Sequence, residues 1–201
     1  MIQGLVLFAI FLLTVTVHEV SHGLVAYARG DETAYRAGRL TLNPLRHIDL
    51  FWTVLFPLFL FSATNGRFAL GMAKPVPVNF WNLKNRRIDT ILVAFAGPLA
   101  NLVFAWLLAI WFRAVLYGPF LFGAYLNLGL AFFNLIPIPP LDGSRILAAL
   151  LPSAGARVLN QIEPFGFLIV FALYMTGVLF AFIMPGINAF ASLLGLPPMG
   201  F

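Results

Sequence analysis

The residues of this sequence best suited to chemistry are two histidines and a glutamate that lie close together in an apolar stretch. His18, Glu19 and His22 form the pattern H-E-x-x-H. Side chains four positions apart lie on one face of a helix, so both imidazoles can bind one Zn²⁺ ion. Glu19 is then placed to take a proton from a water molecule on that ion. The pattern can arise by chance, but three ionisable groups in a lipid-buried helix are costly and therefore indicate a functional site.

Two histidines leave a catalytic zinc ion one protein ligand short, because such sites use three protein ligands and keep one position open. The candidates for the third ligand are His47, Asp49, Asp142 and Glu163. Asp142 is the only charge in a proline-rich apolar segment, and Gly143 beside it allows close approach of the backbone. Asp142 would equally suit the N-cap of a helix over 144–151, so the residue types alone leave both roles open.

The composition places these residues in a membrane protein. Hydrophobic residues make up 61% of the 201 residues and charged residues 9%, against about 45–50% and about 25% in soluble domains. So few charges cannot cover a soluble fold, which excludes a cytosolic enzyme and a disordered chain. The absence of cysteine excludes disulfides, a thiol nucleophile and thiolate metal ligands. The net charge is +5, and the basic residues lie beside apolar runs. This placement indicates membrane orientation rather than nucleic-acid binding.

The apolar runs predict an all-α polytopic membrane protein, organised as a single domain over residues 1–201. We expect about four full spans and one re-entrant hydrophobic segment. The core helices are expected at about 3–28, 88–115 and 119–135, the C-terminal span at 165–184 and the re-entrant segment at 50–61. The last is too short to cross, because twelve helical residues rise only about 18 Å against a hydrocarbon core of about 30 Å. Pro57 also interrupts a regular helix there.

A small extended or β element is expected on the cytoplasmic side, in the polar stretches before and after the re-entrant segment. Prolines at 75 and 77 favour extended backbone over helix. Residues 68–78 would offer a strand edge to which an unwound substrate could add. An ordinary surface loop is the alternative for this segment.

The basic residues predict the orientation. If 50–61 enters and leaves the membrane on the same side, one face carries every basic residue except Arg113. That face holds Arg29, Arg36, Arg39, Arg46, Arg67, Lys74, Lys84, Arg86, Arg87, Arg145 and Arg157. The positive-inside rule makes it cytoplasmic. The same arrangement brings His22 and Asp142 to one side of the membrane, as a shared metal ion requires.

These motifs resemble those of the site-2 protease family of intramembrane zinc metalloproteases, in the short form without a PDZ domain. The H-E-x-x-H pattern is similar to the zinc helix of that family. Residues 134–143 read N-x-x-P-x-P-x-x-D-G and are similar to its second motif, whose aspartate is the third zinc ligand. Gly97-Pro98-x-x-Asn101 resembles the glycine-proline-asparagine element of its middle core helix.

The resemblance implies one Zn²⁺ per chain, held by His18, His22 and Asp142, with Glu19 as the catalytic base. Asn134 is the preferred donor to the oxyanion that develops during hydrolysis, ahead of a second buried asparagine at position 101. Hydrogen bonding between helices is the alternative role for both amides.

The expected function is that of a zinc metalloendopeptidase that hydrolyses peptide bonds of membrane-embedded substrates. The alternative is a membrane zinc-binding or transport protein without proteolytic activity, and Glu19 argues against it because binding alone needs no base. The expected partners are a transmembrane protein substrate and the lipid bilayer, with no nucleic acid. The expected location is a bacterial cell membrane, with the active site towards the cytoplasm.

Overall fold

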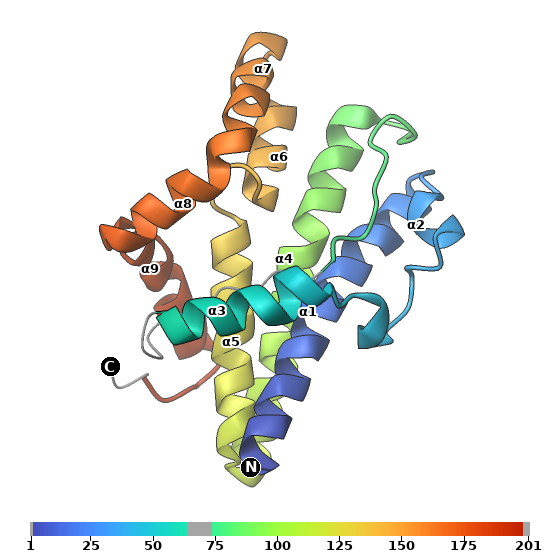
Figure 1. Cartoon of the computed structure of the whole chain (residues 1–201). Coiled ribbons are helices and arrows are strands. Elements are labelled where there is room, and N and C mark those ends of the chain that lie inside the picture. Colours follow the sequence, from blue (N-terminus) through green and yellow to red (C-terminus); the bar gives the residue numbers. More distant parts are fainter. Residues whose placement is uncertain (1, 64–73, 199–201) are drawn as a thin grey trace.

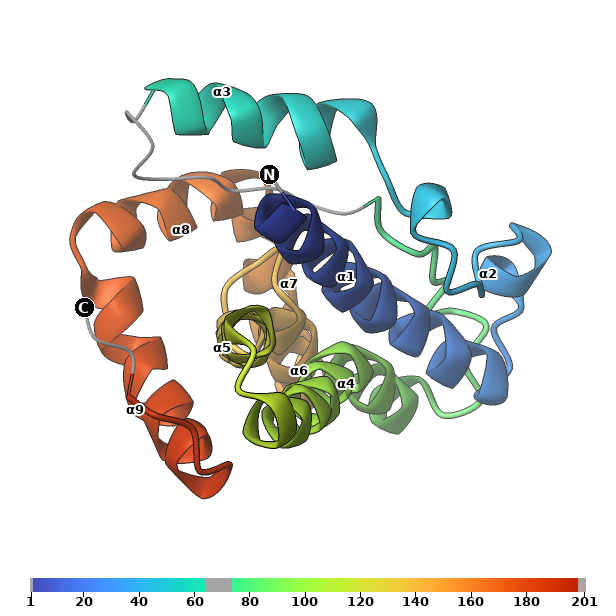
Figure 2. The same cartoon turned by 90° about the horizontal axis from the view of Figure 1, so that it is seen from below.

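Three long helices form the centre of the molecule, which a computed structural model describes for residues 2–63 and 74–198. They are α1 (Ile2–Ala28), α4 (Arg86–Val115) and α5 (Gly118–Asn134). These helices pack on one another along their lengths (Figures 1 and 2). Small side chains such as Ala105 and Ala124 are fully buried in this region and let the helices approach closely.

Shorter helices surround this centre. They are α2 (Thr33–Arg36), η1 (Pro44–Arg46), η2 (Leu50–Leu55), α3 (Phe56–Ala63), α6 (Asp142–Leu150), α7 (Ser153–Ile162), η3 (Glu163–Phe165), α8 (Gly166–Met175) and α9 (Val178–Leu193). The expected all-α class agrees with this architecture. Among the residues that the structure describes, three helical stretches are long and apolar enough to cross a membrane, namely Gln3–Ala28, Arg86–Val115 and Ser153–Met175.

The expected C-terminal span at 165–184 is not a single helix. Helix α8 ends at Met175, and α9 begins at Val178. Gly177 between them has φ +75°, a left-handed conformation that glycine adopts without the strain of a Cβ atom. The candidate span in this part of the chain starts earlier instead, at Ser153. Apolar composition continues across Gly177, which is why the sequence pattern does not show the break.

The segment expected to be re-entrant is helical and lies across the bundle. The π-helix η2 leads into α3, which runs crosswise to α1 in Figure 1. Pro57 lies inside this continuous helical run, at the point where the π-helix passes into α3. Phe56 packs against Phe167 of α8, with ring centroids 6.2 Å apart. The run from Leu50 to Ala63 is helical throughout, and its re-entrant path stays a prediction.

The expected β element is absent from the part of the chain that the structure describes. Residues 74–79 pair with no strand there, and the rest of the proposed edge, 68–73, lies outside the described residues. Pro75 and Pro77 have no N–H to offer a ladder, and the N–H of Val76 donates to the side chain of Glu19 instead. In this part of the proposed edge, the N–H of Val76 is therefore already hydrogen-bonded to Glu19.

The end of α1, the beginning of α4 and the end of α6 lie together at one end of the bundle (Figure 1). The N–H of Lys84 donates to the carbonyl of Arg29, with 3.1 Å between N and O. The guanidinium of Arg87 donates to the carbonyls of Ala149 and Leu150 at the end of α6, at 2.8 and 2.9 Å. These contacts fix the start of α4 against the end of α1 and the end of α6, whereas Asp142 lies at the beginning of α6.

Candidate metal centre

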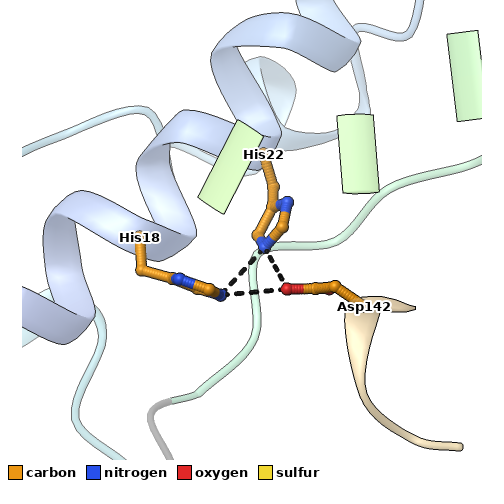
Figure 3. Close-up of side chains that lie close together, drawn as sticks. All are labelled: His18, His22 and Asp142. Atoms are coloured by element: carbon orange, nitrogen blue, oxygen red, sulfur yellow. Dashed lines mark hydrogen bonds and ion pairs between the residues drawn. The ribbon is translucent and has the colours of Figure 1, made fainter. Parts of the chain in front are cut away.

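Two histidines of α1 and one aspartate of α6 converge on a single point (Figure 3). Nε2 of His18 and Nε2 of His22 are 3.1 Å apart, and each lies 3.2 Å from Oδ2 of Asp142. Ligand atoms about 2.0–2.1 Å from a tetrahedral zinc ion lie roughly 3.3–3.4 Å from one another. The nearly equilateral triangle in the protein is close to that size. Two imidazoles and a carboxylate also form a common donor set for catalytic zinc.

One buried atom of this triangle, and a second buried atom of His18 outside it, lack well-formed hydrogen bonds within the described residues. Within the described part of the chain, Oδ2 of Asp142 and Nδ1 of His18 are buried and have no well-formed hydrogen bond. A buried carboxylate oxygen beside two ring nitrogens is costly unless a cation neutralises it. The residues present therefore fit a bound zinc ion.

His22 is held in the orientation that a metal ligand needs. Its Nδ1 lies 2.7 Å from the backbone carbonyl oxygen of Val93 on α4. A carbonyl can only accept a hydrogen bond, so Nδ1 carries the proton and Nε2 presents its lone pair to the centre of the triangle. Helix α4 thus orients a ligand of α1 without supplying one itself.

Gly97 brings the backbone of α4 against both histidines. A Cβ atom at this position would lie 2.4 Å from Nε2 of His22 and 2.7 Å from Nε2 of His18. Such distances are far inside van der Waals contact, so any side chain would displace the ligand atoms. Glycine before Pro98 is therefore needed for the two imidazoles to keep these positions.

Asp142 reaches the centre because α6 begins directly against the end of α5. A Cβ atom at Gly143 would lie 2.2 Å from the carbonyl oxygen of Leu135 and 2.5 Å from that of Ile136. Glycine is therefore needed for this approach, as the sequence predicts. The N-cap of α6 is Leu141, and Asp142 is the first residue of the helix. Its carboxylate faces the two histidines rather than capping α6.

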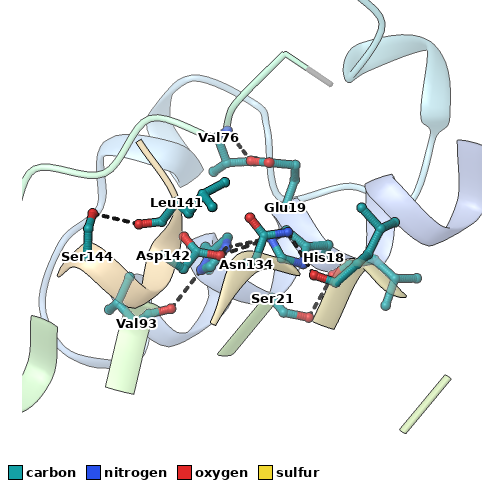
Figure 4. A network of polar contacts seen from close by, with 12 residues as sticks. His18, Glu19, Ser21, Val76, Val93, Asn134, Leu141, Asp142 and Ser144 are labelled. Carbon is teal, nitrogen blue, oxygen red and sulfur yellow. Dashed lines mark hydrogen bonds and ion pairs between the residues drawn. The ribbon is translucent and has the colours of Figure 1, made fainter. Parts of the chain in front are cut away.

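Glu19 is half-buried beside the triangle, next in sequence to His18. Its Oε2 accepts a hydrogen bond from the backbone N–H of Val76, at 2.8 Å (Figure 4). Nothing in local sequence periodicity indicates this contact, because the two residues are 57 positions apart. The sequence does hold one signal for this contact. Pro75 and Pro77 have no backbone N–H, so Val76 carries the N–H that lies between them.

The two asparagines expected near the site differ in their surroundings. Nδ2 of Asn134 donates to the carbonyl of Leu130 one turn earlier in α5, at 3.0 Å, and Figure 4 draws Asn134 within the polar network. Asn101 is fully buried in α4, and its amide has no hydrogen-bond partner within the described residues. Each amide nitrogen carries two hydrogens, and among the described residues only one of those on Asn134 is used.

The other candidates for the third ligand lie apart from the triangle. His47 is buried rather than solvated, and its Nε2 lies 2.9 Å from the carbonyl oxygen of Thr41. The side chain of Asp49 accepts from the N–H of Phe51, at 3.0 Å. Glu163 begins the helix η3. Among the described residues, only His18, His22 and Asp142 form a group that could hold a metal ion.

Comparison with known proteins gives the family. Residues 112–177, which include Asp142, match peptidase family M50. YwhC of Bacillus subtilis is 37% identical over 190 residues, covering 87% of this chain and 82% of that protein. Rip2 of Mycolicibacterium smegmatis is 33% identical over 173 residues, covering 83% of this chain and 65% of that protein. Both relatives are assigned by their names to the zinc metalloproteases. No solved structure matches the chain. The chain therefore belongs to peptidase family M50, the site-2 protease family of intramembrane zinc metalloproteases that its motifs resemble.

Proposed function

We propose that this chain hydrolyses peptide bonds of membrane-embedded protein substrates, with one Zn²⁺ held by His18, His22 and Asp142. The observation that carries the proposal is the triangle of ligand atoms, 3.1–3.2 Å on each side, with the carboxylate of Glu19 beside it. When bound, the ion lowers the pKa of water towards about 7 and polarises the scissile carbonyl.

Glu19 acts as the general base and then as the general acid. It takes a proton from the attacking water as the new C–O bond forms, and it delivers that proton to the leaving amine as the C–N bond breaks. Asn134 uses its second amide hydrogen to stabilise the negative charge that develops on the carbonyl oxygen. One hydrogen of that amide already donates to Leu130, which holds the side chain in place.

The whole chain, residues 1–201, acts as one integral-membrane domain with its active site towards the cytoplasm of a bacterial cell. The clustering of basic residues at the helix ends near the site supports this orientation. In chain order, helix α5 follows α4 and precedes Asp142, and it serves as a further membrane span although it has 17 residues. Cysteine placed at Arg36 or Lys84 should resist an impermeant thiol reagent in intact cells and react after lysis. Labelling of either residue in intact cells contradicts the orientation.

The decisive experiment is cleavage of a model transmembrane substrate in liposomes by the purified protein. Cleavage should stop on addition of a chelator and return with zinc. Glu19→Gln should keep its zinc but lose roughly 10²- to 10⁴-fold in kcat, the contribution of general acid–base catalysis. Wild-type protein that binds zinc without cleaving any substrate would support a zinc-binding or transport protein instead.

A further inference from the structure

The segment 74–79, here called the strap, lies over the catalytic base and is fastened at both ends. At its start, the N–H of Lys74 donates to the carbonyl of His47 at 2.9 Å, and the guanidinium of Arg39 donates to the carbonyl of Lys74 at 2.8 Å. At its end, the N–H of Asn79 donates to the carboxylate of Asp31 at 2.7 Å. The strap is thus held at both ends by hydrogen bonds to residues 31–47, which follow α1 in the chain.

The middle of the strap is pressed against α1. The side chain of Val76 is buried, and a Cβ atom at Gly23 would lie 2.8 Å from its Cγ1. Gly23 directly follows the zinc ligand His22 in α1, so a glycine opens room for the strap next to the metal centre. Val78 packs farther along, against the cluster around Ala26.

The strap has one N–H at its centre, and that N–H points at Glu19. Pro75 and Pro77 carry none, and the N–H of Val76 donates to Oε2 of Glu19 at 2.8 Å (Figure 4). A glutamate side chain has three rotatable bonds and is otherwise free to turn. Fixing Oε2 leaves Oε1 as the oxygen that can face a water molecule beside the triangle.

We propose that the backbone N–H of Val76 is a positioning group for the general base, and that the strap holds the carboxylate of Glu19 in its working orientation. The inference rests on the proposed function for the role of Glu19 and adds a residue to it. In this role, Val76 touches neither substrate nor metal. It acts through Glu19, by limiting where that carboxylate can be when the proton is transferred.

The hydrogen bond itself can be tested without any assay of proteolysis. In zinc-loaded protein labelled with ¹⁵N-valine, the resonance of Val76 is identified by its loss in Val76→Ala. Glu19→Ala should move the amide proton of Val76 upfield and speed its exchange with water. Glu32→Ala is the matched control, because Glu32 is exposed and pairs with Arg36. A Val76 resonance that is unchanged in Glu19→Ala overturns the proposal, whether or not the protein cleaves a substrate.

The consequence for catalysis is tested by two substitutions at one position. Val76→Pro removes the N–H, whereas Val76→Ala keeps it and removes only side-chain contacts. Val76→Pro should lower kcat about 10-fold or more, part of the 10²- to 10⁴-fold that acid–base catalysis supplies, with KM and zinc content unchanged. Val76→Ala should lower kcat less than Val76→Pro does, since its backbone donor is intact.

Equal values of kcat in the two variants, or a higher value in Val76→Pro, would overturn the positioning role. If Val76→Pro fails to fold or loses zinc, an ester bond in place of the amide decides the matter. The α-hydroxy acid analogue of valine, introduced at position 76 by cell-free translation, deletes the N–H and retains the side chain. A normal kcat in that ester variant contradicts the proposal, and a lowered kcat with normal KM supports it.

Discussion

The contact between α1 and α4 and the C-terminal pair α8 and α9 are both built from apolar helices, yet they are organised differently. Between α1 and α4, Gly97 brings the backbone against two histidines, and Val93 accepts a hydrogen bond from one of them. In α9, by contrast, Phe182 is 71% exposed and Leu193 is 79% exposed. The first region positions polar atoms around one point, whereas the outward face of α9 presents apolar surface that lipid can solvate.

The difference follows from what each region must do. A zinc ligand has to lie within a few tenths of an ångström of its position, so every neighbour of the ligands is constrained. A lipid-facing surface has to be apolar, and many side chains satisfy that condition. Substitutions should therefore have effects that decrease sharply from the metal centre outwards to α9.

The largest effect is expected from removing a ligand of the triangle. Asp142→Ala should lower zinc affinity by more than about 100-fold, because even loss of an outer partner of a metal ligand typically costs 10- to 100-fold. Competition with a chromophoric chelator measures the affinity, and the metal content of the purified variant gives an independent check. Full zinc occupancy together with full activity in this variant would show that the third ligand lies elsewhere.

The next largest effect is expected from pushing α4 away from the two histidines of α1. Gly97→Ala should weaken zinc binding roughly 10- to 100-fold, because the new methyl group displaces both imidazoles. Gly129→Ala is the matched control, since a Cβ atom there has no neighbour within 4 Å and alanine favours a helix over glycine. Circular dichroism should show both variants helical. Equal zinc affinity in the two would mean that α4 does not constrain the site.

An intermediate effect is expected from substituting Asp31, which lies beyond the end of α1 and outside the membrane span. Burial raises the pKa of this carboxyl, but hydrogen bonds from Thr33, Asn82 and the N–H of Asn79 outweigh burial and hold the pKa below its ordinary value. Asp31→Asn should lower the free energy of unfolding by about 1–3 kcal/mol at neutral pH, because an amide N–H would face the N–H of Asn79.

The same group predicts a pH dependence with a defined sign. Since folding lowers the pKa of Asp31, its stabilising contribution is complete above the unfolded pKa of about 3.9 and is lost as the pH falls towards the folded value. The stability difference between wild type and Asp31→Asn should therefore shrink below about pH 5. Thermal unfolding in detergent across this pH range measures it. A difference that grows at acid pH would contradict the assignment.

The smallest effect is expected in the C-terminal region. Phe182→Ala should change the free energy of unfolding by no more than about 0.5 kcal/mol, as is usual for exposed positions. Zinc content and kcat should match those of the wild type. A loss of zinc in this variant would mean that α9 supports the metal centre and that the two regions are not independent.

Much of the fold and the candidate site could be predicted from local patterns. The spacing of His18 and His22 depends only on the helical repeat, and long apolar runs suffice to locate α1 and α4. The expected span at 165–184 stays a prediction, and the break between α8 and α9 within it was not anticipated from the sequence. Hydrophobicity is a property of composition, and it carries no information about a turn at Gly177 inside a continuous apolar run.

What the sequence determined by itself is the set of candidate groups for the chemistry: two imidazoles one turn apart, a carboxylate between them and an aspartate after a proline-rich turn. Only the tertiary structure decided how these groups are held. The N–H of Val76 meets Glu19 across 57 positions, and the carbonyl of Val93 meets His22 across 71. Such contacts depend on how helices pack against one another, and helix packing is not encoded in the periodicity of any single segment.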